Sequence, residues 1–424
     1  MIRRILIINF HSGKNAGDLA LLLCTIKTLK KVFENAEIRV SANWIDEPYY
    51  ESYGIEVLPS LRSILRMETS ASTVLQILKF YHLYLKAFLV SLSKKNRQHV
   101  NGKDLDRLIQ AFHESDLIVA VSGNQVYSSG KYGWPLPVTL APLNFANLFK
   151  KPLVVFPQSI GPLKRRWERW MVKKAYAHAK VVFVRDDKSL SLLRELGLPS
   201  EKFTYAPDPA FGLEPAGRIE AHEFLIRAGM RDHKRKIGLT LIPRMGRALN
   251  QENLTTYYEA LERALLEFGQ NNDVQIVLFS QVRGPVPLED DRIPTKELYD
   301  SLKSKGLDVI LFDEEVSPMM LKACYGQMDL FIASRLHSGI FAIGAGTPTL
   351  FLGYLTKTQG ITTRLGLSNY FLDINEISQS KLMERINYLN DHSADVVAEI
   401  QQALQKTKSE LEIIETYLKE MRWN

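Results

Sequence analysis

Cysteine is scarce in this sequence of 424 residues, which contains only Cys24 and Cys324. They lie far apart in apolar stretches of helical pattern, which argues against a disulfide framework and for a reducing compartment. Long hydrophobic runs are also missing, because no uncharged apolar stretch reaches the 18 or more residues needed to span a membrane. The first apolar run, Ile5–Ile8, is too short for a secretion signal. We therefore expect a cytoplasmic protein.

Several recognition signatures are missing as well. The chain has no run of five like charges and no nucleic-acid-binding module, so we expect no nucleic-acid partner. No His, Asp and Glu cluster has the spacing of a metal site, so we predict no metal requirement. No loop carries the three spaced glycines of a dinucleotide site, and we expect no cofactor. Lys and Arg number 54 against 47 Asp and Glu, a surplus of +7 that fits anionic substrates or an anionic membrane face.

Short apolar runs alternate with helical patterns along most of the chain. Continuous apolar strands between helices are typical of parallel sheets covered on both faces. In the first half these runs are Ile5–Ile8, Glu37–Ser41, Leu117–Val121, Leu153–Phe156, Val181–Val184 and Phe203–Ala206. In the second half they are Lys236–Leu241, Val274–Ser280, Val309–Leu311, Leu330–Ile332 and Thr349–Leu352. The fold class predicted is α/β, with two Rossmann-like doubly wound domains.

A boundary between the domains is expected near residues 212–235, where Gly212–Gly217 has the composition of a linker. We predict an N-terminal domain over residues 1–212 and a C-terminal domain over residues 235–395. Residues 396–424 are expected to form a final helix. Whether this helix packs on the N-terminal domain stays open at this point.

The segment Thr73–Ser93 predicts a helix with only a narrow polar stripe, within an apolar insertion at about residues 70–98. A helix this apolar must bury most of its surface. One interpretation places it in the core or between the domains. The other docks it on a membrane surface, where Lys94, Lys95 and Arg97 would face anionic headgroups. Both interpretations stay open.

The strongest candidate site follows the predicted strand Leu330–Ile332 and reads Ser334-Arg335-Leu336-His337-Ser338-Gly339. Arginine binds phosphate or carboxylate in a bidentate manner, and histidine can shuttle a proton near neutral pH. The helix that follows adds a field that favours an anion. The alternative is a structural histidine beside a surface arginine. Three further cations, Lys357, Arg244 and Arg185, follow other strands, so we predict a small, highly anionic ligand.

Two loops of the N-terminal half are weaker candidates. In Asn15–Ala20, Gly17 allows a close backbone approach and Asp18 is expected to cap the following helix. Ser122–Gln125 combines Gly123 with the amides of Asn124 and Gln125 and precedes an aromatic stretch. Amides and aromatic rings of this kind suit a sugar. Each loop taken alone is equally consistent with an ordinary turn. The residues from these loops that we assign to sugar binding are Asn15, Gly17, Gly123, Asn124, Gln125, Tyr127 and Trp134.

Taken together, these segments resemble the polysaccharide pyruvyl transferase family. The resemblance covers roughly residues 5–366, and its motifs fall in the family's order. The matching segments are Asn15–Ala20, Phe156–Pro162, Val184–Asp186 with Ser189, Asp208–Phe211, and Ser334–His337 followed by Pro348, Tyr354, Lys357 and Gly360. Family members resemble B-type glycosyltransferases, with two Rossmann-like domains facing a cleft. The chain departs from the family at Gly123-Asn124-Gln125, where a run of glycines is common, and this affects the sugar side of the site.

The resemblance implies a transferase that moves an enolpyruvyl-derived group from phosphoenolpyruvate onto a sugar of a surface polysaccharide. The acceptor would be the polysaccharide or its lipid-linked precursor at the inner membrane face. The resemblance assigns donor binding to Arg335 and His337. His337 is then either the general acid or a phosphate contact, and Asp18 is a candidate base. Ser334, Lys357, Arg244 and Arg185 are expected to contact the donor. Two alternatives are a B-type glycosyltransferase that uses a sugar nucleotide and an inactive glycan-binding relative.

Overall fold

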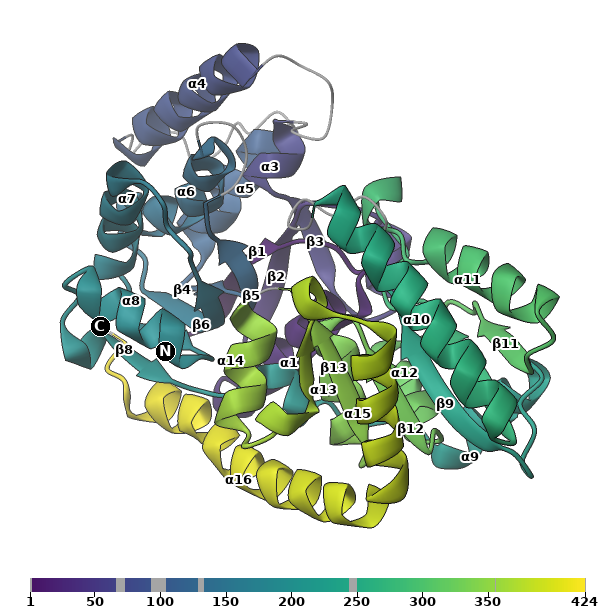
Figure 1. Ribbon diagram of the computed structural model, residues 1–424. Coiled ribbons are helices and arrows are strands. Elements are labelled where there is room, and N and C mark those ends of the chain that lie inside the picture. Colours follow the sequence, from purple (N-terminus) through teal and green to yellow (C-terminus); the bar gives the residue numbers. More distant parts are fainter. Residues whose placement is uncertain are drawn as a thin grey trace. The chain divides into compact units, whose positions relative to one another are not determined.

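A computed structural model describes residues 2–65, 73–92, 104–128, 133–243, 250–354 and 356–423. The chain forms two compact units, each built around one parallel sheet (Figure 1). The first unit comprises Met1–Gly13, Leu21–Pro209 and Leu411–Asn424. The second comprises Lys14–Ala20 and Ala210–Glu410. Two short stretches therefore differ from the division we expected, since Lys14–Ala20 joins the second unit and the last residues join the first.

The first sheet has the strand order β3-β2-β1-β4-β6-β7-β8, and β5 pairs with β6 outside this path. All of its strand pairs are parallel. Its strands are β1 (Arg4–Phe10), β2 (Glu37–Ala42), β3 (Glu56–Pro59), β4 (Leu117–Ala120), β5 (Gly123–Val126), β6 (Leu153–Ile160), β7 (Val181–Val184) and β8 (Phe203–Tyr205). The chain leaves β1 towards β2 on one side and resumes at β4 on the other. This reversal is the switch point of a doubly wound fold.

The second sheet repeats this design with the order β11-β10-β9-β12-β13-β14, and its pairs are again parallel. Its strands are β9 (Arg235–Thr240), β10 (Val274–Phe279), β11 (Val309–Phe312), β12 (Leu330–Ala333), β13 (Thr349–Gly353) and β14 (Phe371–Asp373). The switch point lies between β9 and β12. The prediction of two Rossmann-like doubly wound domains is confirmed.

Every strand expected from the sequence is present. The structure adds three short strands that we did not expect, β3, β5 and β14. The segment Gly123–Val126, interpreted from the sequence as a loop, forms β5 beside β6. The prediction of a loop there was wrong, because pairing with β6 overrides the weak strand preference of Gly, Asn and Gln.

Helices connect the strands in both units. In the first unit they are α1 (Ala16–Val32, which begins in the second unit), α2 (Glu47–Glu51), α3 (Leu61–Ile64), α4 (Thr73–Leu92), α5 (Asp104–Glu114), α6 (Pro135–Leu148), α7 (Arg166–Ala177) and α8 (Asp187–Glu195). In the second they are α9 (Arg218–Arg227), α10 (Gln251–Asn271), α11 (Arg292–Ser304), α12 (Pro318–Tyr325), α13 (Leu336–Gly344), α14 (Thr356–Arg364), α15 (Gln379–Asp391) and α16 (Ser393–Glu420). The expected long final helix is α16, and its last turns belong to the first unit.

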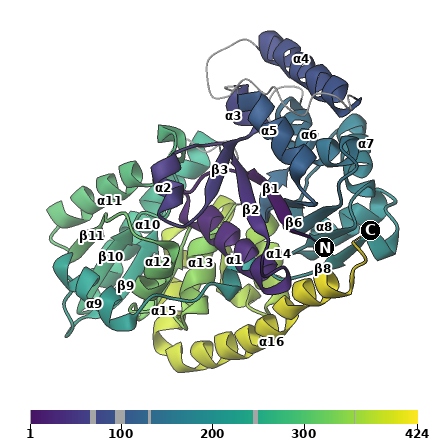
Figure 2. The same ribbon diagram turned by 180° about the vertical axis from the view of Figure 1, so that it is seen from behind.

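Helix α4 has two different faces. Phe80 and Ala87 are buried in the core of the first unit, and the Gln76 side chain is buried as well. On the other face Val74 and Leu78 are more than 60% exposed. Figures 1 and 2 show α4 on the outside of the first unit, beyond α3, α5 and α6. Among the described residues, α4 included, no helix is both long enough and apolar enough to cross a membrane.

Candidate functional site

The carboxyl ends of β9 and β12 meet at the switch point of the second sheet, which is where open α/β sheets bind ligands. The backbone of Ser334, directly after β12, donates a hydrogen bond to the Thr240 carbonyl at 3.3 Å. The Thr240 and Ser338 hydroxyls lie 2.7 Å apart, and so do the Ser334 and Tyr257 hydroxyls. Because Tyr257 is buried, its pKa is raised and it stays a neutral phenol. These bonds hold the start of α13 against the sheet. The hydroxyl of Ser334, a residue predicted to contact the donor, is therefore already bonded to Tyr257.

Arg335 is the residue before α13, and a buried carboxylate holds its side chain. Its Nε donates to Asp291 Oδ2 at 3.2 Å, and its Nη2 donates to Asp291 Oδ1 and, at 3.5 Å, to the Glu289 carbonyl. Within the described residues no such bond involves Nη1. The side chain of Arg335 is 23% exposed, whereas that of Asp291 is fully buried. Arg335 is thus held from one edge, with the other edge available to an anion.

Asp291 was not foreseen from the sequence. Burial raises its pKa to about 6, while the Arg335 guanidinium and the Val282 amide, which donates to it at 3.0 Å, oppose that rise. The carboxylate is therefore ionised at neutral pH and pairs with Arg335, whose own pKa is raised by this partner. A signal was present in the run Glu289-Asp290-Asp291-Arg292, but nothing in the sequence connects it to residue 335.

Gly17 and His337 come into close contact within the second unit. A Cβ atom placed on Gly17 would lie 2.3 Å from Nδ1 of His337 and 2.5 Å from its Cγ. Only glycine lets the backbone of α1 approach the imidazole so closely. His337 is half-buried in the first turn of α13. Gly17, which was predicted to bind the sugar, therefore contacts His337, which was predicted to bind the donor.

Asn15 fixes the turn that carries Gly17. Its Oδ1 accepts hydrogen bonds from the amides of Gly17 at 3.0 Å and Asp18 at 3.4 Å. Asn15 thus caps α1, and the prediction that Asp18 is the cap was wrong, because the helix begins at Ala16. Asp18 instead lies half-buried in the first turn, where a carboxylate is favoured by the helix field.

The loop after β10 adds polar groups beside this turn. The Ala16 amide donates to the Gln281 carbonyl at 3.2 Å, and the Arg283 amide donates to the Lys14 carbonyl at 2.8 Å. Lys14 pairs with Glu315 at 2.5 Å and Arg283 with Asp313 at 2.7 Å, so both cations are partly neutralised. These residues were not predicted. For Gln281 and Arg283, the position directly after the strand Val274–Ser280 was the available signal.

Two buried donors in this loop have no hydrogen-bond partner among the described residues, namely Ser280 Oγ and Gln281 Nε2. The two residues are only 4% and 2% exposed. Buried polar groups in native proteins are nearly always satisfied. Donors left in this state at the carboxyl edge of a sheet are consistent with a ligand site.

The remaining predicted cations have different surroundings. Lys357 is half-buried in the first turn of α14, which follows β13. Strand β13 pairs with β12, the strand that precedes Arg335. Arg244 lies outside the described residues. Arg185 is 1% exposed in the first unit, where it pairs with the buried Asp208 and donates to Ser159 Oγ at 3.0 Å. Its guanidinium therefore has structural partners, and direct donor binding by Arg185 stays a prediction.

The other residues predicted to bind the sugar, from Gly123 to Trp134, lie in the first unit, whereas Asn15 and Gly17 lie in the second. Gln125 donates from Nε2 to the carbonyl of Asn9, whose φ of 64° is unusual for a residue other than glycine. Ser122 Oγ and Asn124 Oδ1 are buried without a partner among the described residues. Tyr127 is 37% exposed. The first unit therefore also has strained backbone and unsatisfied polar atoms at the switch point of its sheet, features that cluster at functional sites.

Trp134 packs on α4. Its indole nitrogen donates to Gln76 Oε1 at 3.2 Å, and its ring meets Phe80 edge to face at 5.6 Å. Sugar stacking by Trp134 stays a prediction.

His11 is a candidate that the sequence prediction passed over, although it directly follows the first strand. Ser60 Oγ accepts from the Ser63 amide at 3.1 Å, so its proton is directed to Asn43 Oδ1 at 2.6 Å. The Asn43 amide then donates to His11 Nδ1 at 3.2 Å. This chain of bonds assigns the proton of neutral His11 to Nε2, making that atom a hydrogen-bond donor.

Comparison with known proteins agrees with the fold and with these motifs. Residues 15–356 match the model of the polysaccharide pyruvyl transferase family. The chain belongs to this family and is a transferase of polysaccharide biosynthesis. It is 22% identical over 423 residues to the amylovoran biosynthesis protein AmsJ of Erwinia amylovora, covering 96% of each chain.

Solved structures show the same fold at low identity. HepE of Anabaena in complex with UDP-glucose is 15% identical, with a TM-score of 0.58 and 98% of each chain covered. A UDP-N-acetylglucosamine 2-epimerase assigned as putative, from Listeria monocytogenes, is 13% identical, with a TM-score of 0.62 and coverage of 100% of this chain and 98% of that one. The chain therefore has the fold of B-type glycosyltransferases.

Proposed function

We propose that this protein transfers an enolpyruvyl-derived group from phosphoenolpyruvate to a sugar, forming a pyruvate ketal. The acceptor is a surface polysaccharide or its lipid-linked precursor. The observation that carries this proposal is the placement of Arg335 and His337 at the start of α13, at the switch point of the second sheet. Family membership and the similarity to a protein of amylovoran biosynthesis support the same chemistry.

Phosphoenolpyruvate carries a phosphate and a carboxylate, so its site needs fixed cations and hydrogen-bond donors. Arg335 offers Nη1 while Asp291 holds the opposite edge of its guanidinium. The amides at the start of α13 add a field that favours anions. Lys14 and Arg283 flank the adjoining turn, and Gln281 brings a buried amide donor. Together these groups suit a small ligand with two anionic ends.

The reaction forms two C–O bonds and breaks one. The methylene carbon of the donor takes up a proton and becomes a methyl group, while a sugar hydroxyl attacks the central carbon and loses its proton. The bond from that carbon to the phosphate oxygen then breaks, and a second hydroxyl closes the ketal with loss of its proton. The products are the ketal and inorganic phosphate.

We assign His337 to donor protonation or to a phosphate contact. Asp18 is assigned to proton removal from the acceptor, and Lys357 to the donor. Ordered general acids contribute about 10²–10⁴-fold to rate. We further propose that no metal cofactor takes part. Among the described residues no group of three or more His, Cys, Asp and Glu side chains is placed to hold a metal ion. Turnover should then be unchanged by a chelator.

The test compares donor binding and turnover in the wild type and in Arg335→Ala. Loss of a close charge partner should weaken phosphoenolpyruvate binding by at least about 2 kcal/mol in a calorimetric titration. Arg263→Ala, which removes a guanidinium that is 64% exposed, is the matched control. Unchanged affinity in Arg335→Ala would exclude Arg335 from the donor site.

His337→Asn separates the two roles of the histidine. If His337 is the acid, turnover should fall by about 10²-fold with little change in donor affinity. If it contacts the phosphate, donor affinity should fall instead. Wild-type values of both quantities would remove His337 from the site.

A second candidate function is transfer of a sugar from a sugar nucleotide, since a structure of the same fold was solved with UDP-glucose. The cations around Arg335 would also bind a diphosphate. Incubation with phosphoenolpyruvate and, separately, with UDP-glucose decides between the two, with a panel of lipid-linked oligosaccharides as acceptors. Release of inorganic phosphate and a product of ketal mass support the proposal. Release of UDP instead would replace it.

A further inference from the structure

Helix α4 exposes a stripe of apolar side chains to solvent instead of burying it. Val74, Leu78, Tyr81, Leu85 and Leu89 are 66%, 62%, 64%, 55% and 56% exposed. Their spacing of four, three, four and four residues places them on one face of the helix. A polar side chain, in contrast, lies on the inner face, where Gln76 is buried and accepts a hydrogen bond from Trp134. Phe80 and Ala87 make the inner face apolar as well, so α4 carries apolar side chains on the outer face, which is polar in an ordinary surface helix. Contiguous apolar patches of this kind mark interaction sites.

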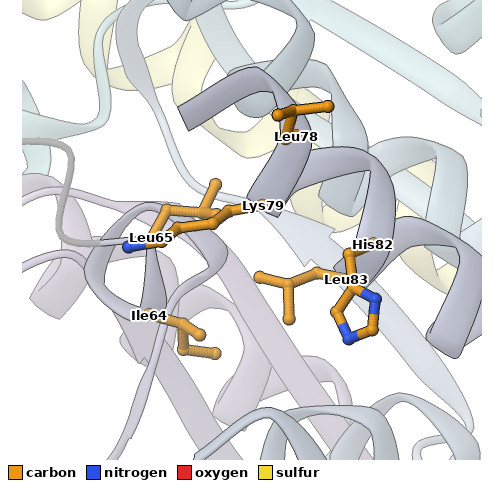
Figure 3. Close-up of a pocket in the computed structure, with 6 residues that line it drawn as sticks. All are labelled: Ile64, Leu65, Leu78, Lys79, His82 and Leu83. Atoms are coloured by element: carbon orange, nitrogen blue, oxygen red, sulfur yellow. The ribbon is translucent and has the colours of Figure 1, made fainter. Parts of the chain in front are cut away.

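The inner edge of the stripe borders a cavity between α3 and α4. The cavity has a volume of about 440 Å³ and is lined by Ile64, Leu65, Leu78, Lys79, His82 and Leu83. Figure 3 shows Leu83 pointing from α4 towards Ile64, with Lys79 extended alongside Leu65. Apolar walls with a lysine and a histidine among them suit an amphiphile that has an apolar chain and an anionic end.

Helix α7 supplies cations and aromatic rings on the same side of the first unit. Trp167 and Trp170 are 37% and 61% exposed, and the Lys174 ammonium lies 5.1 Å from the centre of the Trp170 ring. Arg166, Lys173 and Lys174 are exposed as well. Tryptophan combined with basic side chains is typical of surfaces at the membrane interface.

The two helices are connected through the start of α6. Trp134 contacts Phe80 and Gln76 of α4. A Cβ on the preceding Gly133 would lie 2.8 Å from the Trp167 ring of α7. Both helices also pack against α6, and Figures 1 and 2 show α4 above α6 and α7 beside it. The exposed side chains of α4 and α7 therefore belong to one region, which we call the α4–α7 surface.

Acidic side chains are almost missing from this surface. The sequences of α3 and α4 contain no Asp or Glu. The single acidic residue of α7, Glu168, is fully buried and pairs with Arg165. The exposed charges that α4 and α7 contribute are thus positive. Lys86 pairs with Asp106 of α5 and Arg169 with Glu195 of α8, and the other cations complement an anionic surface.

We propose that the α4–α7 surface docks the protein on an anionic membrane. The stripe of α4 enters the boundary between headgroups and acyl chains, and the tryptophan and lysine side chains of α7 lie at the headgroup level. A second copy of the chain fits less well. A two-fold interface would place the same basic patch against itself, and like charges oppose that contact. The proposal concerns the partner of the surface and holds whichever donor the transferase uses.

Vesicle co-sedimentation with the full-length protein tests the proposal. We expect binding to vesicles that contain phosphatidylglycerol, weaker binding to pure phosphatidylcholine, and release as salt screens the lysines. The double variant Leu78→Gln and Leu85→Gln should lose at least about tenfold in vesicle affinity, because two inserted side chains are replaced by polar ones. The matched control is Ile219→Gln with Ile293→Gln, which alters apolar side chains of the second unit that are 78% and 52% exposed.

The charge contribution has its own pair of variants. Lys173→Gln with Lys174→Gln should bind phosphatidylglycerol vesicles about tenfold to thirtyfold less tightly, since each basic residue contributes about 1 kcal/mol. Lys406→Gln with Lys408→Gln removes two exposed lysines of α16 and should bind like the wild type. Transfer of Trp170 into the interface should also shift tryptophan emission to shorter wavelength in the wild type, and less so in Trp170→Phe.

Three results would overturn the proposal. The first is no vesicle binding by the wild type at low salt. The second is equal loss of binding in the α4 variant and its control. The third is a wild-type dimer that becomes a monomer in Leu78→Gln with Leu85→Gln while neither binds vesicles, which would identify a second copy as the occupant. Titration of the wild type with phosphoenolpyruvate keeps the two ideas apart. Absent vesicle binding with intact donor binding contradicts only the membrane proposal, whereas absent donor binding with intact vesicle binding contradicts only the proposed function.

Discussion

Gly17 shows how the absence of one methyl group shapes the site. The residue lies in the first turn of α1, and a Cβ there would lie 2.3 Å from the imidazole of His337. We predict that Gly17→Ala displaces His337 and lowers kcat by about tenfold or more, since small misplacements of catalytic groups have large effects. Stability should not fall in parallel, because alanine is the better helix former by about 1 kcal/mol.

Steady-state kinetics and thermal unfolding of the same sample test this separation. Gly217→Ala is the control, since its added Cβ would meet nothing closer than 3.9 Å. A Gly17→Ala protein with wild-type kcat would show that the imidazole is free to move, and the proposed role of the close contact would then fail.

Asp291 makes folding depend on pH. Its pKa is raised from 3.8 to about 6 in the folded protein, so the chain takes up a proton on folding between those values. The stability that this carboxyl contributes is present below about pH 4 and is lost as pH rises through about 6. Across this interval the change amounts to about 3 kcal/mol, from roughly two pKa units at 1.36 kcal/mol each. Asp291→Asn cannot titrate and lacks this slope.

Urea unfolding of the wild type and of Asp291→Asn from about pH 4 to 7 measures the effect. We expect the stability of the wild type relative to the variant to decline steadily as pH rises. Asp300→Asn, at a carboxylate that is 58% exposed, controls for the loss of one negative charge. Parallel curves for the wild type and Asp291→Asn would mean that Asp291 has an ordinary pKa.

The sequence placed Arg335 and His337 correctly at a strand end, because a buried strand followed by polar residues identifies the carboxyl edge of a parallel sheet. It did not reveal Asp291, which reaches Arg335 from 44 residues away through a loop of irregular backbone. It also misplaced the cap of α1, since Asn15 and Asp18 are equally good cap residues and only the start of the helix distinguishes them.

At the scale of elements, the position of α13 depends on its contact with β13. A Cβ on Gly339 would lie 2.0 Å from Cε1 of Phe351, a ring that is completely buried. We predict that Gly339→Ala destabilises the second unit by about 1–3 kcal/mol through overpacking. The displacement of α13 should also move Arg335 and His337 relative to the sheet, so activity should fall as well.

Urea unfolding followed by circular dichroism, together with a double-mutant cycle, tests the cause. Phe351→Leu alone should destabilise by leaving a gap, whereas the combination with Gly339→Ala should recover part of the loss. Strict additivity of the two substitutions would show that the ring does not limit the approach of α13.

Every strand that is buried along its whole length was predicted from the sequence, and β3, β5 and β14 are not among these strands. Strands β6 and β10, for example, have eight and six residues, mostly apolar, that are all buried. The missed strands have only three or four residues, and β5 reads Gly-Asn-Gln-Val. Such segments become strands because a neighbour such as β6 offers backbone partners, and this information lies in the fold and not in the local pattern.

At the scale of the molecule, the two units are interleaved along the chain. Residues Lys14–Ala20 leave the first unit to complete the site around His337, and Leu411–Asn424 return to the first unit at the end of α16. The sequence predicted two domains and a long final helix, but not these exchanges, because neither has a change of composition at its boundary. The returning segment buries Ile414 and Leu418, and its Tyr417 and Trp423 meet Phe183 and Phe33 edge to face.

This interleaving allows each unit to be observed by itself. All five tryptophans of the chain, Trp44, Trp134, Trp167, Trp170 and Trp423, lie in the first unit, so tryptophan emission follows its unfolding. Leu418→Ala removes a completely buried side chain and should destabilise the first unit by about 2–5 kcal/mol. Thr416→Ala, at an exposed position two residues earlier, should unfold like the wild type.

Calorimetric titration with phosphoenolpyruvate should give the wild-type affinity for both variants under native conditions, because the proposed donor groups belong to the second unit. If the emission transition of Leu418→Ala coincides with that of the wild type, the last turns of α16 do not stabilise the first unit. A loss of donor affinity in this variant, without unfolding, would show instead that the C-terminal segment supports the donor site.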